Sequence, residues 1–295
     1  MKYVVSISLG SGLRDQTSEL ELLGQRIILQ REGWGGDFAK ITKRFEELDG
    51  QVDALGMGGA DLWVYSKNKR FRMHAAHKLI RHVTHTPIVD GSGLKNTLEK
   101  QTAEVIEKAV GKRKRVLITC ALERPGMTQS FFEHGYEVLC GDLGFSLGIP
   151  YPIYTQKALN SLASFLMPVV SRLPQSMLYP IGETQNQIKP KFQDWYNWAE
   201  VIAGDCLYIR RHIPKDLSGK IIVTNTTTSA DRKLFTDRGV ERLFTTTPII
   251  EGRSYGANVL EAALTALKGL NRPLNAYELQ SLINQLSLKP TLAML

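Results

Sequence analysis

The sequence predicts an α/β protein of two domains, the second of which is built around a mainly parallel sheet. The chain has 295 residues, of which 43% are hydrophobic and 22% charged, as in ordinary two-domain globular proteins. In the second half, short strand-like runs alternate with helical patterns, which is typical of βαβ units. These runs are apolar throughout rather than alternating, as expected of parallel strands that are covered on both faces.

The first domain is expected to be a mixed α/β domain over residues 1–96. Two of its segments, residues 37–48 and 73–83, have the apolar spacing of helices. Residues 97–110 are expected to form the helix that joins this domain to the next. The strand candidates of the first domain are KYVVSIS, RIILQ, VDALGMG, DLWVY and TPIVD.

The second domain, residues 97–256, starts with a βαβ pattern. The run RVLITC at residues 115–120 leads through the loop ALERPG into a short helix that ends at Gly135. The run EVLCG at residues 137–141 follows and is closed by Asp142. Such a crossover between parallel strands predicts a Rossmann-like domain.

The strand pattern returns after an insertion over residues 143–199. A helix that begins at Ser229 and ends before Gly239 is expected between the last two strands of the domain. Residues 257–295 are expected to form helices that pack back on the body of the protein. The further strand candidates are residues 201–204, 220–224 and 242–246.

The turn after residues 115–120 is the strongest candidate for a cofactor site. A dinucleotide needs backbone N–H groups at a helix start for its pyrophosphate, and an acidic side chain after the next strand for a ribose hydroxyl. Gly126 and Asp142 stand at these positions, with Thr119 and Arg124 beside them. The loop has one glycine where the dinucleotide fingerprint has three, so a plain strand-to-helix turn is the alternative.

The acidic residue makes NAD the favoured cofactor over NADP. The Asp142 carboxylate would accept hydrogen bonds from the ribose hydroxyls of NAD and would repel the 2′-phosphate of NADP. Arg124 is the opposing feature, because a guanidinium in the same turn could hold that phosphate.

Further polar residues are found where open α/β sheets bind ligands, beyond the carboxyl ends of strands. Thr224 and Asn225 are assigned to the cofactor, and Asn96, Thr246 and Arg253 to the substrate. Threonine is also a common strand former, so an ordinary structural role is the alternative for the threonines.

Asp90 and Lys95 form the candidate catalytic pair. They lie in the segment DGSGLKNT, between a strand and the helix that joins the domains. A lysine held beside an aspartate can move a proton to or from a substrate hydroxyl when burial lowers the pKa of the lysine. A helix start with a solvent-facing lysine is the alternative.

Several segments are similar to those of a known family. They are VDGSGLKNTLEK, AEVIAGDCLYIRRHIP, VTNTTT and TTTPIIEGRSYGANVLEA, and the likeness extends over nearly the whole chain. The family that they resemble is a bacterial one named quinate 5-dehydrogenase. In the shikimate and quinate dehydrogenases a catalytic domain precedes an NAD(P)-binding domain, with a Lys–Asp pair between them, and the resemblance implies this architecture. Their Asn-x-Thr-x-Pro-x-Lys and Asn-Thr-Asp signatures do not occur here, and Lys95 and Asp90 are the nearest substitutes, so the resemblance does not specify the substrate.

Together these features predict an NAD(P)-dependent oxidoreductase that acts on a small hydroxy or carbonyl substrate. One alternative is a non-catalytic nucleotide-binding or regulatory protein with a degenerate Rossmann fold, and another is an enzyme on a lipid-like substrate. An apolar stripe at helical spacing lies in the insertion and consists of Leu159, Leu162, Leu166, Val169 and Leu173. This stripe could cover a lipid-like substrate or contact a membrane surface, although a core or homodimer contact is more usual.

Composition argues against other classes of partner. The net charge of +8 is spread along the chain, and its densest run, residues 112–115, has no interleaved aromatic residues, so no nucleic acid is expected. No segment has the roughly 20 mostly apolar residues of a membrane span. The 3 cysteines lie far apart, which favours a reducing compartment and hence the cytoplasm. No metal site is expected, because the histidines of residues 74–85 lack a carboxylate on the same face.

Overall fold

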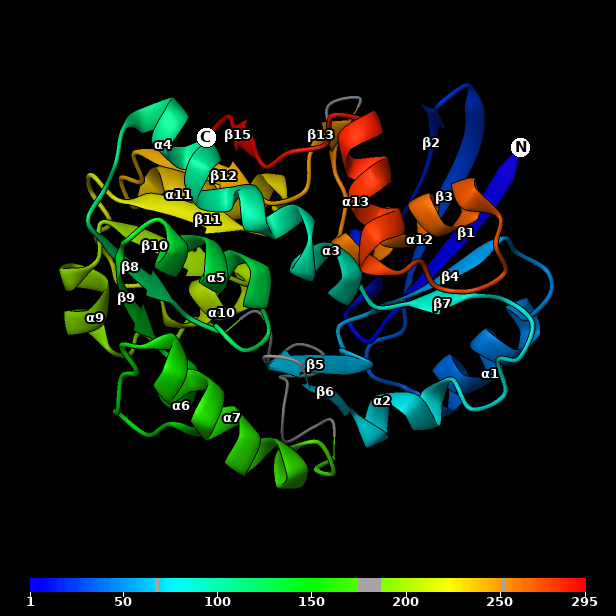
Figure 1. Ribbon diagram of the computed structural model, residues 1–295, viewed down its shortest axis with the longest axis horizontal. Helices are drawn as coiled ribbons and strands as arrows, with labels where there is room; N and C mark the ends of the chain where they lie inside the picture. Colours follow the sequence, from blue (N-terminus) through cyan, green and yellow to red (C-terminus); the bar gives the residue numbers. More distant parts are fainter. Residues whose placement is uncertain (67–68, 175–186, 251–252) are drawn as a thin grey trace. The chain divides into compact units, whose positions relative to one another are not determined.

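A computed structural model describes residues 1–66, 69–174, 187–250 and 253–295. The chain forms two compact units, and each has a mixed α/β fold with a sheet that is mainly parallel (Figure 1). The first unit comprises Met1–Leu94, Leu166–Gln185 and Tyr255–Ser287, and the second comprises Lys95–Phe165, Asn186–Ser254 and Leu288–Leu295. The predicted C-terminal helices therefore belong to the first unit.

The first unit contains a five-stranded sheet. In spatial order its strands are β2 (Gln16–Leu22), β3 (Gln25–Gly33), β1 (Lys2–Ser8), β4 (Ala54–Gly58) and β7 (Ile88–Val89). β1 pairs in parallel with β3 and β4, β7 is parallel to β4, and β2 forms an antiparallel hairpin with β3. A separate hairpin joins β5 (Trp63–Ser66) and β6 (Lys69–Arg72).

Helices complete the first unit. α12 (Ala257–Lys268) contacts β1, β3 and β4, and almost all of its residues are buried. Gly269 ends α12 in the left-handed conformation. The other helices are η1 (Gly12–Arg14), α1 (Phe38–Leu48), α2 (His74–Leu79) and α13 (Ala276–Gln285), and α3 (Ser92–Asn96) leads into the second unit.

The second unit contains a six-stranded sheet. In spatial order its strands are β15 (Thr291–Ala293), β12 (Arg242–Thr245), β11 (Ile221–Thr224), β10 (Val201–Gly204), β8 (Arg115–Ile118) and β9 (Glu137–Cys140). All neighbours are parallel except β15, which is antiparallel to β12. A short hairpin joins β13 (Ile249–Ile250) and β14 (Arg253–Ser254).

Helices cover both faces of this sheet, so the expectation of a covered parallel sheet is confirmed. Buried apolar residues of α4 (Thr102–Val110) and α5 (Pro125–Glu133) pack on one face, with the start of α7 (Gln156–Val170). The other face packs against residues of four helices. These are α6 (Asp142–Leu147), α9 (Gln193–Trp198), α10 (Cys206–His212) and α11 (Ser229–Asp237).

The strand order differs from that of the dinucleotide-binding Rossmann fold. Numbered along the chain, the parallel strands β9, β8, β10, β11 and β12 have the 2-1-3-4-5 order of another doubly wound sheet, whereas the Rossmann order is 3-2-1-4-5-6. The mixed α/β fold with a parallel sheet was therefore predicted correctly, and the Rossmann order is not found among the described strands.

Candidate functional site

The second unit has a topological switch point between β8 and β10. The chain leaves β8 for α5, on one face of the sheet, and leaves β10 for α10, on the other face. A crevice at the carboxyl ends of the strands is the general consequence of such a reversal, and open α/β sheets bind ligands there. Arg124, Asp205 and Asn225 follow β8, β10 and β11, and polar contacts connect them.

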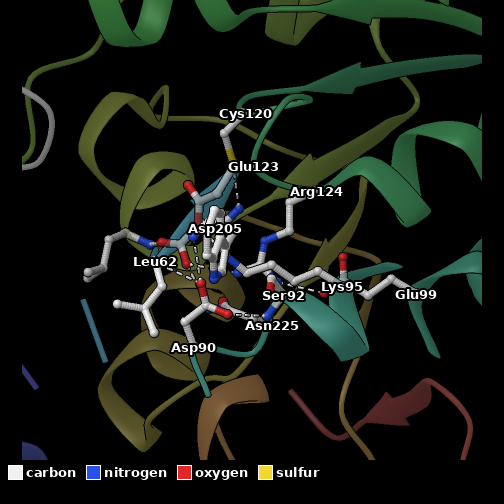
Figure 2. A network of polar contacts seen from close by, with 12 residues as sticks. Leu62, Asp90, Ser92, Lys95, Glu99, Cys120, Glu123, Arg124, Asp205 and Asn225 are labelled. Atoms are coloured by element: carbon white, nitrogen blue, oxygen red, sulfur yellow. Dashed lines mark hydrogen bonds and ion pairs between the residues drawn. The ribbon is translucent and has the colours of Figure 1, made fainter. Parts of the chain in front are cut away.

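Arg124, in the turn after β8, is at the centre of a buried polar network (Figure 2). Its side chain is only 2% exposed, and its Nη1 donates to Glu99 Oε1 over 2.6 Å. Its Nη2 donates to Asp205 Oδ2 over 3.1 Å. Burial by itself lowers the pKa of Arg124, but the carboxylates of Glu99, Glu123 and Asp205 outweigh burial and raise that pKa well above its usual value. The guanidinium therefore remains charged.

Asp205 connects the network to the next strand. Its Oδ2 also accepts a hydrogen bond from Asn225 Nδ2 over 2.7 Å, and its Oδ1 accepts one from the backbone N–H of Leu207, which caps α10. Asn225 is fixed in turn, because its Oδ1 accepts the N–H of Cys206 over 3.2 Å. Asp205 and Asn225 are thus held by helix α10 and by each other.

Glu99 and Lys95 reach the same network from the segment before α4. Thr246, after β12, donates its hydroxyl to Glu99 Oε1 over 3.0 Å. Lys95 Nζ lies 3.2 Å from Glu123 Oε1, and these two side chains are 7% and 15% exposed. We refer to Lys95, Glu99, Glu123, Arg124, Asp205 and Asn225 as the Arg124 cluster.

Two atoms of the Arg124 cluster are buried without a hydrogen-bond partner among the described residues. They are Glu99 Oε2 and Arg124 Nε. Buried polar atoms are nearly always paired, and leaving one unpaired costs about 1–3 kcal/mol. A buried acceptor and a buried donor without partners among the described residues therefore lie near the carboxyl edge of a parallel sheet.

Gly204 makes the approach of β10 to β8 possible. Its φ is +137°, and a Cβ at this position would lie 2.2 Å from Thr119 Oγ1. Thr119 is itself fully buried and donates to the carbonyl of Ala203. Thr119 and Thr224 consequently support the turns of the site, since the Thr224 hydroxyl donates to Asn225 Oδ1.

Asp142 is the first residue of α6, and its carboxylate binds backbone of the same unit instead of pointing to where a ribose was expected. The residue is 8% exposed, and its carboxylate accepts the backbone N–H groups of Ala121 and Leu122 over 3.1 and 2.9 Å. These are N–H groups of the turn expected to receive the cofactor. The protein thus places its own carboxylate on that turn.

Gly126 and Arg124 also contact other residues of the protein where a cofactor was expected. A Cβ on Gly126 would lie 2.2 Å from the carbonyl oxygen of Lys95, so this glycine permits a close contact between α5 and the backbone. Arg124 is neutralised by two carboxylates rather than directed at a phosphate. The prediction that NAD or NADP is bound here is therefore wrong, because the groups expected to hold the cofactor already have partners within the protein.

The predicted catalytic pair lies in two different units. Asp90 belongs to the first unit, where its carboxylate accepts the backbone N–H groups of Leu62, Trp63 and Ser92. Lys95 belongs to the second unit, where Glu123 is its carboxylate partner.

The predicted substrate residues do not form one group. Thr246 joins the Arg124 cluster through Glu99. Asn96 is the last residue of α3 and is half-buried. Arg253 begins β14, and its side chain lies outside the described residues.

Sequence reasoning missed Glu99, Glu123 and Asp205. Asp205 directly follows β10, so the rule that selected Asn225 after β11 would also have selected Asp205. Glu123 directly precedes Arg124 in the loop after β8, so the same rule would have selected it too. Glu99 has no comparable local signal, because only the fold brings it to Arg124.

A pH dependence follows from the burial of Asp142. Burial raises the pKa of Asp142 from 3.8 to about 6, against the opposing effect of the N–H groups of Leu122 and Ala121. A carboxyl with a higher pKa in the folded state binds its proton more tightly there, so its contribution to stability is complete below about pH 4 and is lost as the pH rises through about 6. We expect the wild-type protein to lose about 3 kcal/mol of unfolding free energy relative to Asp142→Asn over this interval.

Urea denaturation of both proteins at about pH 4 and about pH 7 checks this expectation. The Asp142→Asn variant is the control, because all other carboxyl groups titrate in both proteins. An equal difference in stability at the two pH values would show that Asp142 does not titrate in this range.

Within the described ranges, no helix is long and apolar enough to cross a membrane. Likewise, no group of three or more His, Cys, Asp and Glu side chains in these ranges is arranged to hold a metal ion. α7 buries Leu159, Ala163 and Met167, whereas Val169 of the predicted apolar stripe is 65% exposed.

The chain is similar in fold to several solved structures at low sequence identity. One is an ABC transporter solute-binding protein from Burkholderia multivorans, with 14% identity, coverage of 92% of this chain and 94% of that chain, and a TM-score of 0.39. Another is a protein from Mycobacterium smegmatis in complex with beta-D-fucofuranose, with 11% identity, 100% coverage of both chains and a TM-score of 0.33. A third is a periplasmic ribose ABC transporter protein from Conexibacter woesei, with 9% identity, coverage of 96% and 94%, and a TM-score of 0.33. No curated protein matches the chain.

These comparisons correct the expected family and activity. The resemblance to the quinate 5-dehydrogenase family is wrong, since the models that match the sequence belong to two other families. The predicted NAD(P)-dependent oxidoreductase activity is also wrong, because Asp142 and Arg124, the residues expected to hold the cofactor, are engaged within the protein.

The family models that match the sequence cover almost all of it. A family described as a domain of unknown function (DUF8753) matches residues 3–90, and a second, also described as a domain of unknown function (DUF8754), matches residues 93–295. The second match covers more than half of the chain. The chain therefore belongs to the family described as the domain of unknown function DUF8754.

Proposed function

We propose that this protein binds a small ligand rich in hydroxyl groups at the Arg124 cluster. The observation that carries the proposal is the pair of buried atoms without partners, Glu99 Oε2 and Arg124 Nε, among residues that meet at a switch point of the sheet. Switch points are the usual ligand sites of open α/β sheets. A ligand hydroxyl can donate to the carboxylate oxygen and accept from the guanidinium.

The charges of the cluster favour a neutral ligand over an anion. Glu99, Glu123 and Asp205 supply three carboxylates, against the two cations Lys95 and Arg124. An added phosphate or carboxylate would meet a surplus of negative charge, and like charges placed together cost several kcal/mol. Hydroxyl groups avoid this cost because each one both donates and accepts.

The shape of the side chains supports the same ligand class. Carboxylate, amide and guanidinium groups are planar and present two hydrogen-bonding atoms side by side, as neighbouring hydroxyls on a ring or chain require. Asp205 is 16% exposed, and Asn225 is also partly exposed. These two residues would meet the ligand first, and the buried Arg124 and Glu99 would bind it at the base of the site.

Thermal unfolding with neutral and charged ligands tests the proposal. The probes are D-ribose, D-fructose and myo-inositol, with D-ribose 5-phosphate as the anionic comparison. At a concentration of about 100 times its Kd, a ligand raises the free energy of unfolding by about 2.7 kcal/mol. We expect at least one neutral probe to raise the Tm by about 5–10 °C, and D-ribose 5-phosphate to have no effect.

A variant pair identifies the site. Asn225→Ala removes an amide of the Arg124 cluster and should weaken binding of the active probe about 10-fold. Asn197→Ala, an exposed asparagine on α9, should bind as the wild-type protein does. Failure of all three neutral probes to bind at about 10 mM, or equal binding by both variants, would contradict the proposal.

A further inference from the structure

A pocket lies at the outer edge of β9, at the opposite end of the strands from the Arg124 cluster. Its volume is about 460 Å³, which is within the range of small-molecule sites. Its walls include Phe132, Tyr136, Val138, Tyr154, Thr155 and Trp198. All of them belong to the second unit.

The backbone of Val138 faces this pocket from the free edge of the sheet. Cys140 exchanges two backbone hydrogen bonds with Ile153 across the outer edge of β9, over 2.8 and 3.1 Å. The N–H of Glu137 instead points to β8, where it donates to the carbonyl of Lys114. Because backbone groups alternate along a strand, the N–H and C=O of Val138 point outward as those of Cys140 do.

No backbone partner continues the sheet opposite Val138 within the described residues. After Ile153 the chain turns away from β9, and the hydroxyl of Thr155 accepts the N–H of Ala158 at the start of α7. The pocket therefore occupies the wedge between Val138 and residues 154–156. It presents a donor and an acceptor side by side.

Aromatic side chains flank this wedge on both faces of the sheet. Phe132 and Tyr136 pack with the core on the α4 and α5 face, whereas Trp198 packs with the core on the opposite face. The guanidinium of Arg115 lies 5.8 Å from the centre of the Trp198 ring and supports it. A flat ring that continues the plane of the sheet would thus have aromatic groups above and below it, an arrangement that favours stacking.

We propose that this pocket binds a planar heteroaromatic ring that has a hydrogen-bond donor next to an acceptor. The acceptor of the ring takes the N–H of Val138, the donor gives to its C=O, and Trp198 and Tyr136 contact the faces of the ring. An extended peptide is a poorer fit, because residues 153–156 close one end of the wedge. This site is independent of the ligand proposed for the Arg124 cluster.

Calorimetric titration with two purines tests the edge contacts. Adenine is used as 9-methyladenine, which has an amino donor beside a ring acceptor, and 6-dimethylamino-9-methylpurine has the same ring system without an N–H donor. We expect 9-methyladenine to bind about 10-fold more tightly than 6-dimethylamino-9-methylpurine, the ratio produced by the loss of one hydrogen bond. Equal affinity, or no binding of adenine at about 10 mM, would overturn the proposal.

Substitutions in the protein test the same contacts with the ligand kept unchanged. Trp198→Ala should weaken adenine binding about 10-fold through lost stacking, and Trp198→Phe should retain most of the affinity. Val138→Pro removes an N–H that points away from β8 but also replaces a buried side chain, so its far-UV circular dichroism must match that of the wild-type protein. Adenine binding should then fall about 10-fold. Tyr151→Ala, an exposed aromatic residue that is not part of the pocket wall, is the control and should bind normally. Unchanged binding by both Trp198→Ala and Val138→Pro would overturn the proposal, whatever the result at the Arg124 cluster.

Discussion

Arg124→Met is expected to lower the free energy of unfolding by about 3–5 kcal/mol, the loss typical when one partner of a buried ion pair is removed. Methionine fills a similar volume, so lost packing contributes little. The loss arises because Glu99, which is 1% exposed, would retain a buried negative charge without a cation beside it. Asp205 would lose a donor at the same time. Urea denaturation measures the effect.

Arg113→Met is the matched control for this prediction. Arg113 pairs with Glu241 over 3.2 Å in the same unit, but the two side chains are 30% and 36% exposed. Removing such a partly exposed pair should cost no more than about 1 kcal/mol. Adding Glu99→Gln to Arg124→Met should restore part of the stability, because the buried charge is then absent. Equal losses in Arg113→Met and Arg124→Met would show that the Arg124 cluster is not stabilised by its ion pairs.

Gly204→Ala is expected to cost about 2–6 kcal/mol, from two sources of about 1–3 kcal/mol each. The first is backbone strain, because φ at Gly204 is +137°, a region that side chains rarely adopt. The second is overpacking, because the new methyl group would lie 2.2 Å from Thr119 Oγ1 between β10 and β8. The next residue is Asp205, so the variant should also bind ligand more weakly at the Arg124 cluster.

Gly111→Ala separates these two sources. Gly111 has a φ of +76° and a ψ of 168°, but a Cβ there would have no atom within 4 Å, so only backbone strain of about 1–3 kcal/mol is expected. The comparison is made by urea denaturation of both variants. A loss in Gly204→Ala no larger than that in Gly111→Ala would contradict the close contact between the two strands.

Several elements could be predicted from local pattern alone. The run KYVVSIS is β1, and each of the apolar runs predicted in the second half forms a strand. The helix predicted for residues 37–48 is α1, which Asp37 caps by accepting the N–H of Lys40. β2 was missed because its residues are largely polar, and it is held by its hairpin with β3 rather than by a buried apolar run.

The role of Asp142 shows the limit of motif reasoning. Its position after the second strand of a βαβ unit was predicted correctly, and that position is typical of a ribose ligand. The interactions of Asp142 were not predicted correctly, because its carboxylate accepts the N–H groups of Ala121 and Leu122. A sequence motif places a side chain on an element, but neighbouring backbone donors decide what that side chain binds.

The sequence by itself determined the parallel sheet of the second unit and placed Arg124, Asn225 and Thr246 after its strands, because apolar runs and the residues that end them are local properties. Only the tertiary structure decided which polar groups meet. Glu99 lies 25 residues before Arg124, and Asp205 lies 81 residues after it. Their meeting depends on β8 and β10 being neighbours, and strand order results from the packing of helices on both faces rather than from any local period.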